Sequence, residues 1–244
     1  MGDALHGSSG TNLKVIENSE IWFTMMVKIK TAFRMNVLIF ILEVFAICWM
    51  FSGINSGILA ASRLYALRYF TVDSNILMGI AALVMAVDEH KVLKGEKREV
   101  SQSCFVFKLV GTVGVTLTML VTVFFLTPTM GPVYGYLSLF SHSNFLLHLL
   151  NPVLSIISFV RYEKTDKIAF KHTFTGIVPM LIYAVYYMAS AVSHSENGEI
   201  AKGYDWYGFF IGGIKSAVIV VPVMLIVTFG ISAVLWKLNR LKKS

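Results

Sequence analysis

Charged residues are scarce in this sequence. Asp, Glu, Lys and Arg make up 14% of its 244 residues, whereas a soluble domain has roughly 25%. A chain with so few charges lacks the polar surface to face water on all sides, which excludes an ordinary soluble globular protein. The net charge is +7, but the basic residues lie beside apolar runs and form no single patch, so we expect no nucleic-acid binding.

Cysteine is scarce as well, with only Cys48 and Cys104. Both fall in or beside apolar runs, near opposite faces of the expected membrane, and neither has the spacing of a metal ligand. We therefore expect no disulfide, no metal site and no cofactor. We also expect no cleavable signal peptide, because the first 20 residues are polar and no apolar core follows a basic start.

Apolar residues are abundant, at 56% of the chain. About 20 consecutive apolar residues span a bilayer as a helix, and a helix satisfies its own backbone groups in hydrocarbon. The sequence predicts an all-α fold, a polytopic membrane bundle of six transmembrane helices over residues 36–54, 64–87, 105–126, 133–160, 174–192 and 207–236.

The expected organisation has three parts. Residues 1–35 form a polar N-terminus that ends, from Ile21 to Met35, in an interfacial amphipathic segment. Residues 36–236 form the six-helix transmembrane domain, and residues 237–244 form a basic tail.

Lys and Arg are distributed unevenly between the two sides of this predicted bundle. Seventeen, Lys108 among them, lie in the two terminal segments and in the second-to-third and fourth-to-fifth connections, while three lie on the opposite side. Because basic connections stay in the cytoplasm, we expect both termini to be cytoplasmic, in a protein of the plasma membrane.

Polar side chains recur within two of the apolar runs. Ser141, Asn144, His148 and Asn151 follow one another at steps of three, four and three, which places them on one face of a helix. Thr71, Ser74 and Asn75 form a similar stripe on the second run, with Asp73 pointing elsewhere. We expect the two stripes to face each other inside the bundle.

Two charged side chains lie well inside apolar runs. An isolated charge is costly there, so Glu43 and Lys215 are predicted to be each other's partner in an intramembrane ion pair. Asp73 has Arg68 as a candidate partner near the outer boundary.

A threonine and a histidine on facing stripes can perform covalent catalysis. A hydroxyl becomes a useful nucleophile when a neighbouring base removes its proton, and Thr71 with His148 supplies that pair. Asn144 or Asn75 would orient the imidazole or donate to an oxyanion. A site within lipid would meet acyl chains and esters, so the expected partner is a lipid or acyl-ester substrate.

The segments RYFTVDSNIL and FLLHLLNP, in a six-span chain of this length, resemble the androgen-induced gene family, which includes the androgen-dependent tissue-factor-pathway-inhibitor-regulating protein. The resemblance implies six spans and hydrolysis of fatty acid esters of hydroxy fatty acids. It also implies that Thr71 is the nucleophile and His148 the base. The sequence departs from the animal members after the histidine and at Asp73-Ser74-Asn75, and His142 is a rival for the base.

Other functions are compatible with the same residues. A small-solute or ion transporter or channel would use Glu43, Asp73, His148 and Lys215 to line a polar path. A photoreceptor with retinal on Lys215 is remote, since six spans are predicted and no counter-ion lies one turn before that lysine. A membrane subunit without chemistry of its own is a further alternative, and acyl transfer is an alternative to hydrolysis.

Overall fold

The computed structural model describes residues 8–54, 63–197, 199–201, 203–210 and 213–241. Their regular secondary structure is helical except for a short antiparallel pair of strands, β1 (Ser195–Glu196) and β2 (Glu199–Ile200), and loops connect the elements. The α-helices are α1 (Ser8–Phe51), α2 (Phe70–Leu93), α3 (Gln102–Val121), α4 (Thr127–Thr129), α5 (Pro132–Leu139), α6 (Ser143–Phe145), α7 (Asn151–Ile157), α8 (Val178–Ser193) and α9 (Ala217–Arg240).

Turns of other helix types join these elements. They are the 3₁₀ helices η1 (Arg63–Arg68), η5 (Phe170–Ile177) and η6 (Ile214–Ser216), and the π-helical turns η2 (Thr122–Leu126), η3 (Leu146–Leu150) and η4 (Ser158–Tyr162).

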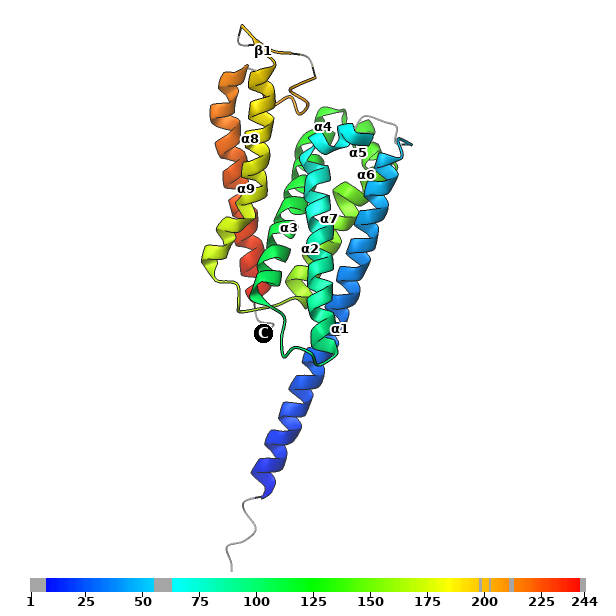
Figure 1. The fold of residues 1–244 in the computed structure, drawn as a ribbon, viewed down its shortest axis with the longest axis vertical. Helices are drawn as coiled ribbons and strands as arrows, with labels where there is room; N and C mark the ends of the chain where they lie inside the picture. The colour runs from blue at the N-terminus through cyan, green and yellow to red at the C-terminus, as the bar shows by residue number, and fades with distance from the viewer. Residues whose placement is uncertain (1–7, 55–62, 198, 202, 211–212, 242–244) are drawn as a thin grey trace, which may run out of the picture.

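Six helical segments are long and apolar enough to cross a membrane, which confirms the predicted all-α six-span bundle. They are Trp22–Phe51, Phe70–Leu93, Gln102–Thr129, Ser143–Tyr162, Phe170–Ser193 and Ala217–Arg240. Figure 1 shows α1, α2, α3 and α7 side by side, with α8 and α9 packed on the α3 side of this group.

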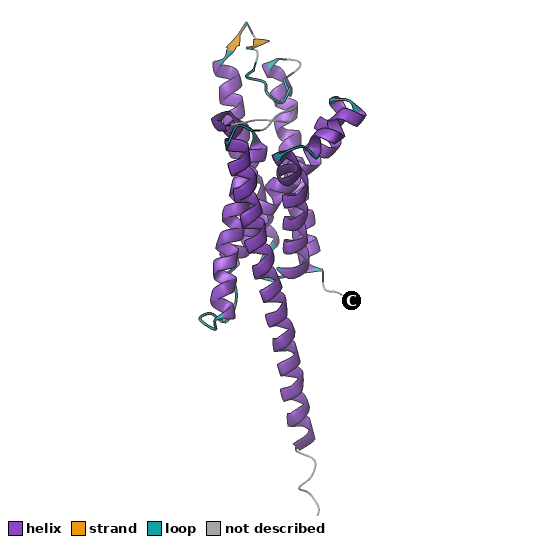
Figure 2. Ribbon diagram, turned by 90° about the vertical axis from the view of Figure 1, so that its right-hand side faces the viewer, coloured by secondary structure: helices purple, strands orange, loops and turns teal. Residues whose placement is uncertain are grey.

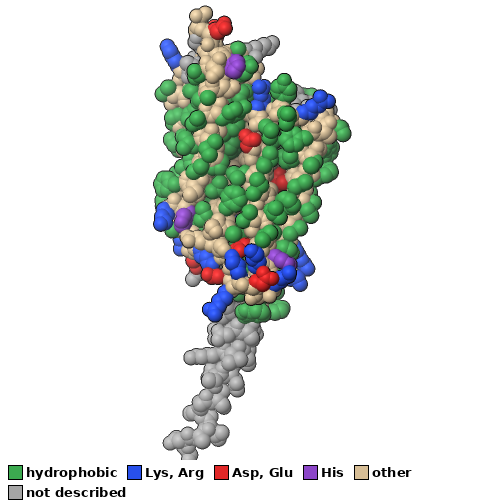
Figure 3. Space-filling model, viewed as in Figure 1, with side chains coloured by type: hydrophobic (Ala, Val, Ile, Leu, Met, Phe, Trp, Pro, Cys, Tyr) green, Lys and Arg blue, Asp and Glu red, His purple; other side chains and the backbone are tan. Residues whose placement is uncertain are grey.

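The two ends of the bundle differ in charge. Figure 3 shows apolar side chains over the sides of the molecule and a concentration of Lys and Arg at the end where α1 enters the bundle and α9 finishes. The connections 94–101 and 163–169 lie at the same end, and β1 lies at the other. The start and the end of the described chain, in α1 and α9, therefore lie on the same side of the bundle. That this side faces the cytoplasm stays a prediction.

Helix α1 has 44 residues without a break. At 1.5 Å per residue it is about 66 Å long, roughly twice the hydrocarbon thickness. Its first half projects from the bundle (Figure 2). The predicted interfacial segment Ile21 to Met35 is thus a continuation of the first span, because nothing in its sequence stops the helix.

The fourth predicted run is two elements instead of one. Helix α5 ends at Leu139, and the chain turns at His142, whose φ of 52° is left-handed, before α6 begins. Helix α5 folds back on α4, and only glycine fits at this contact, since a Cβ on Gly135 would lie 2.0 Å from the carbonyl oxygen of Thr127. The fourth span is consequently Ser143–Tyr162.

Candidate functional site

Asn75 connects the start of α2 to the second turn of the fourth span. Its amide nitrogen donates to the carbonyl oxygen of Thr71 at 2.7 Å and to that of Leu147 at 3.1 Å. Leu147 directly precedes His148, so one buried side chain holds the segments of the predicted nucleophile and the predicted base together. Asn75 uses both amide hydrogens in this bridge, so it cannot also donate to an oxyanion.

His148 lies in the π-helical turn η3 and is almost fully buried. Its Nδ1 lies 3.2 Å from the carbonyl oxygen of Asn144. A carbonyl only accepts hydrogen bonds, so Nδ1 carries the proton and Nε2 is left as the basic nitrogen. The Asn144 backbone, and not its side chain as predicted, therefore orients the ring.

Thr71 lies in the first turn of α2 and is half-buried. It lines a cavity of about 30 Å³ whose wall includes Thr118, Tyr183 and Tyr207. His148 does not line this cavity, and no hydrogen bond joins it to Thr71 among the described residues. The structure thus brings the two segments together without forming the nucleophile–base contact.

The aromatic segment 207–210, predicted to begin the sixth span, closes the cavity instead. The backbone N–H of Phe70 donates to the Tyr207 hydroxyl at 2.9 Å. Asp205 holds this segment in place by accepting from the backbone N–H groups of Phe209 and Phe210, at 2.9 Å each, and from the hydroxyl of Tyr187. Burial raises the pKa of Tyr207 to about 12, so its hydroxyl stays protonated at neutral pH.

Tyr207 was missed because it was taken as the first residue of the sixth apolar run, and Asp205 because it lay in the connection before that run. In the structure α9 begins only at Ala217. The signal available in the sequence was the single carboxylate among the five aromatic residues of YDWYGFF, which suits a loop with a polar centre.

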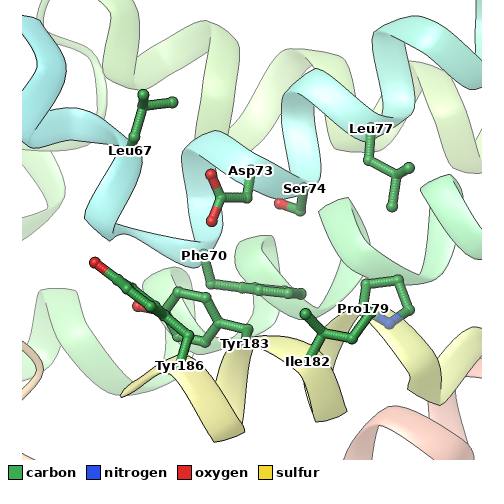
Figure 4. A pocket seen from close by; sticks show the side chains of 9 residues that line it. All are labelled: Leu67, Phe70, Asp73, Ser74, Leu77, Pro179, Ile182, Tyr183 and Tyr186. Carbon is green, nitrogen blue, oxygen red and sulfur yellow. The ribbon is translucent and has the colours of Figure 1, made fainter. Parts of the chain in front are cut away.

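Ser74 and Asp73 both border the groove between α2 and α8, but only Ser74 also contacts α3. Ser74 pairs with the Thr118 hydroxyl of α3 at 3.0 Å, and Gly114 gives this contact room. Asp73 faces a groove of about 390 Å³ between α2 and α8. Figure 4 shows Phe70 and Tyr183 beside Asp73 in this groove. The same two rings line the Thr71 cavity, with centroids 5.2 Å apart, so they separate the two spaces.

The remaining residues of the fourth-run stripe are dispersed by the turn at His142. Ser141 lies outside the helix and donates to the carbonyl oxygen of Ser138 at 2.7 Å. The His142 ring packs against Trp49 of α1, with centroids 6.1 Å apart. Asn151 is buried beside Glu43. The π-helical turn breaks the three-four-three spacing that the prediction assumed.

The predicted Glu43–Lys215 ion pair is wrong. Lys215 is exposed in η6, before the sixth span begins. Glu43 is buried in α1, faces Asn151 and is within electrostatic reach of Lys108, yet neither carboxylate oxygen has a hydrogen bond of ordinary geometry. Among the described residues, Asp73 also forms no ion pair with Arg68. The Arg68 guanidinium lies instead 4.9 Å from the Trp206 ring centroid.

A buried charged cluster lies at the basic end of the bundle. Lys108, assigned to a connection by the sequence analysis, is fully buried in α3 and lies 3.4 Å from Glu163. Its Nζ donates to Asn36, and the Asn36 amide donates to Glu89 at 3.0 Å and to Glu163 at 2.9 Å. Acidic residues at the ends of apolar runs are usually solvated, so the sequence did not mark Glu89 and Glu163. In the described part of the chain, no three His, Cys, Asp or Glu side chains group as metal ligands would.

These features define an integral multi-pass helical membrane protein in which Asn75 links the backbone of Thr71 in the second span to that of Leu147, next to His148, in the fourth. Residues 141–244 match the family model described as "Protein of unknown function (DUF1600)". The matched part includes His148 and leaves out Thr71. No curated protein and no solved structure matches the chain.

Proposed function

We propose that the protein is an intramembrane lipid ester hydrolase that uses Thr71 as nucleophile and His148 as base. The observation that carries the proposal is the Asn75 bridge, which fixes the carbonyl oxygens of Thr71 and Leu147 to one amide. The hydrogen bond of His148 Nδ1 to a carbonyl oxygen supports it further, because it leaves Nε2 as the proton acceptor. The proposal agrees with the resemblance to the androgen-induced gene family.

The proposed reaction has two halves. Thr71 Oγ1 attacks the ester carbonyl carbon and gives its proton to Nε2 of His148. The ester C–O bond breaks, and the departing alcohol takes that proton. Water then attacks the acyl-Thr71 ester while His148 accepts its proton, and Thr71 recovers a proton as the free fatty acid leaves. The protonated hydroxyl of Tyr207, on the wall of the Thr71 cavity, is the proposed donor to the oxyanion.

Substrate access requires movement. A cavity of about 30 Å³ is close to the space of one water molecule and cannot hold an ester with its acyl chains. The groove between α2 and α8 is larger, and apart from Asp73 and Ser74 its wall consists of aliphatic and aromatic side chains. We propose that the acyl chain lies in this groove and that Phe70 and Tyr183 separate to admit the ester to Thr71.

Ester hydrolysis by purified protein tests the assignment. Fatty acid esters of hydroxy fatty acids are the substrate, and Thr71→Ala and His148→Ala should each abolish turnover. The double variant should be no worse than either single one, because members of a catalytic unit fail together. Thr116→Ala is the matched control, since this buried threonine only donates to the carbonyl oxygen of Thr112 in its own helix. His142→Ala tests the rival base and should retain turnover.

A specific observation favours a second candidate, a transporter for a small solute or ion. Glu43, Asn75, Asn151 and Ser155, in α1, α2 and α7, carry buried polar atoms that have no hydrogen-bond partner in the described part of the chain. Such atoms in a membrane protein commonly line a polar path. This candidate predicts solute flux in proteoliposomes that Glu43→Leu stops, together with unchanged flux in Thr71→Ala.

A further inference from the structure

A cavity of about 640 Å³ lies at the basic end of the bundle, away from Thr71. It is bordered by the middle of α1, the end of α2, the start of α3 and the segment after the fourth span. Its wall is apolar at Met25, Ile29 and Phe105, and two buried carboxyl side chains, Glu89 and Glu163, line it as well. It therefore offers both apolar surface and negative charge to one occupant.

Two buried carboxyl groups share one ammonium in the cluster beneath this cavity. Lys108 is the cation that contacts Glu163 in this cluster. Glu89 and Glu163 both accept a hydrogen bond from the single Asn36 amide. Oε1 of Glu163 also accepts from the Ser158 hydroxyl, whereas its Oε2 is buried and has no hydrogen-bond partner among the described residues. A buried carboxylate oxygen without a donor is costly, so one further cation with hydrogen-bond donors would complete the cluster.

The outer part of the same cavity is positive. Two of its four cations are already engaged: Lys167 pairs with Glu99 at 2.9 Å, and Lys164 donates to the carbonyl oxygen of Leu241. Lys28 and Arg98 also line the cavity and have no ion pair with a described residue. An occupant that carries only positive charge would be repelled here, whereas one that also carries an anionic group would be held.

We propose that this cavity binds a zwitterion with a primary ammonium and a phosphate or carboxylate, the ammonium at Glu163 and Glu89 and the anionic group at Lys28 and Arg98. The ammonium supplies three donors, and charge-assisted hydrogen bonds to buried carboxylates are strong. The headgroup of an ethanolamine phospholipid has this chemistry, and so do free phosphoethanolamine and small amino acids. The apolar wall favours the lipid.

Thermal unfolding of the detergent-solubilised full chain tests the proposal, because a ligand that binds only the folded state raises the midpoint. Phosphatidylethanolamine should raise it, while phosphatidylcholine with the same acyl chains should not, since its trimethylammonium has no N–H. An equal effect of free phosphoethanolamine would support the same chemistry with a soluble source. Equal shifts with the ethanolamine and choline lipids, or no shift with any probe, would overturn the proposal.

Variants locate the binding. Glu163→Gln keeps the shape and one acceptor but removes the charge, and should weaken phosphatidylethanolamine binding about tenfold or more, the value of a hydrogen bond to a charged group. Lys28→Ala and Arg98→Ala should each weaken it several-fold, and they remain informative if Glu163→Gln does not fold. Lys237→Ala, an exposed cation on α9, is the matched control. Unchanged affinity in all three cavity variants would contradict the assignment.

Discussion

At the scale of residues, one asparagine decides whether the candidate site forms. Asn75 carries no chemistry in the proposed reaction, yet its amide joins the backbone of Thr71 to that of Leu147. A side chain that spans two carbonyl oxygens positions its neighbours more rigidly than packing alone, because both donors are directional. The same device occurs elsewhere in the fold, where the Asn239 amide donates to the carbonyl oxygens of Phe159 and Glu163.

This repetition provides a matched pair of variants. Asn75→Leu and Asn239→Leu should both lower the free energy of unfolding, by about 1–3 kcal/mol for two carbonyl oxygens left unpaired; Asn239→Leu also loses the bond that Asn239 accepts from the Thr165 N–H. Ester hydrolysis per folded molecule should fall only in Asn75→Leu. Comparable activity loss in both variants would mean that Asn75 acts through stability alone.

Lys108 is the residue on which the charged cluster depends. Lys108→Met leaves Glu163 and Glu89 buried without their cation, so unfolding should become easier by about 3–5 kcal/mol. Glu99→Gln removes the exposed partner of Lys167 and should cost less than about 1 kcal/mol. Chemical denaturation of the two variants in the same detergent compares these costs; similar small losses would show that Lys108 is not compensating buried carboxylates.

At the scale of elements, small residues set how closely the helices approach. A Cβ on Gly176 of η5 would lie 2.5 Å from the Ser232 hydroxyl of α9, which donates to the Thr173 carbonyl oxygen at 2.8 Å. Gly176→Ala should therefore cost about 1–3 kcal/mol of stability through overpacking and a lost hydrogen bond.

Gly230 is the control for this prediction, since nothing lies within 4 Å of a Cβ placed there. Gly230→Ala in α9 should leave stability unchanged or raise it by up to about 1 kcal/mol, because alanine is the better helix former. The unfolding midpoints of both variants check the contrast, and a stable Gly176→Ala would argue that η5 and α9 do not pack as described.

The helices were predicted from the sequence more successfully than the turns between them. Apolar length alone located all six spans, since hydrocarbon demands a helix wherever a run is long enough. It could not find the turn at His142, because an apolar run reads the same whether α5 folds back or continues. It also could not distinguish the aromatic segment that covers Thr71 from a helix start.

The candidate site was also predictable in part, because polar residues stand out within apolar runs. Thr71, Asn75 and His148 were identifiable as polar residues in apolar runs, and their segments do meet. The partners of Glu43 and Lys215 were not, because pairing depends on tertiary position and Lys215 lies outside the span. Glu89 and Glu163 were not singled out, and Lys108 was assigned to a connection, since residues near the ends of spans are ordinarily exposed to water.

At the scale of the whole molecule, orientation follows from the distribution of basic residues. In a cysteine-free background, Lys94→Cys lies at the basic end and Ser195→Cys at the opposite end. A membrane-impermeant maleimide added to intact cells should label Ser195→Cys and should label Lys94→Cys only after permeabilisation. The reverse pattern would place both chain ends outside.

Mapping a covalent adduct tests the central claim most directly. Wild-type protein treated with a fluorophosphonate that targets serine-type nucleophiles is digested, and the modified peptide is sequenced by mass spectrometry. The proposed mechanism predicts an adduct on the Thr71 hydroxyl, lost in Thr71→Ala and strongly reduced in His148→Ala. An adduct on another residue, or equal modification in both variants, would contradict it.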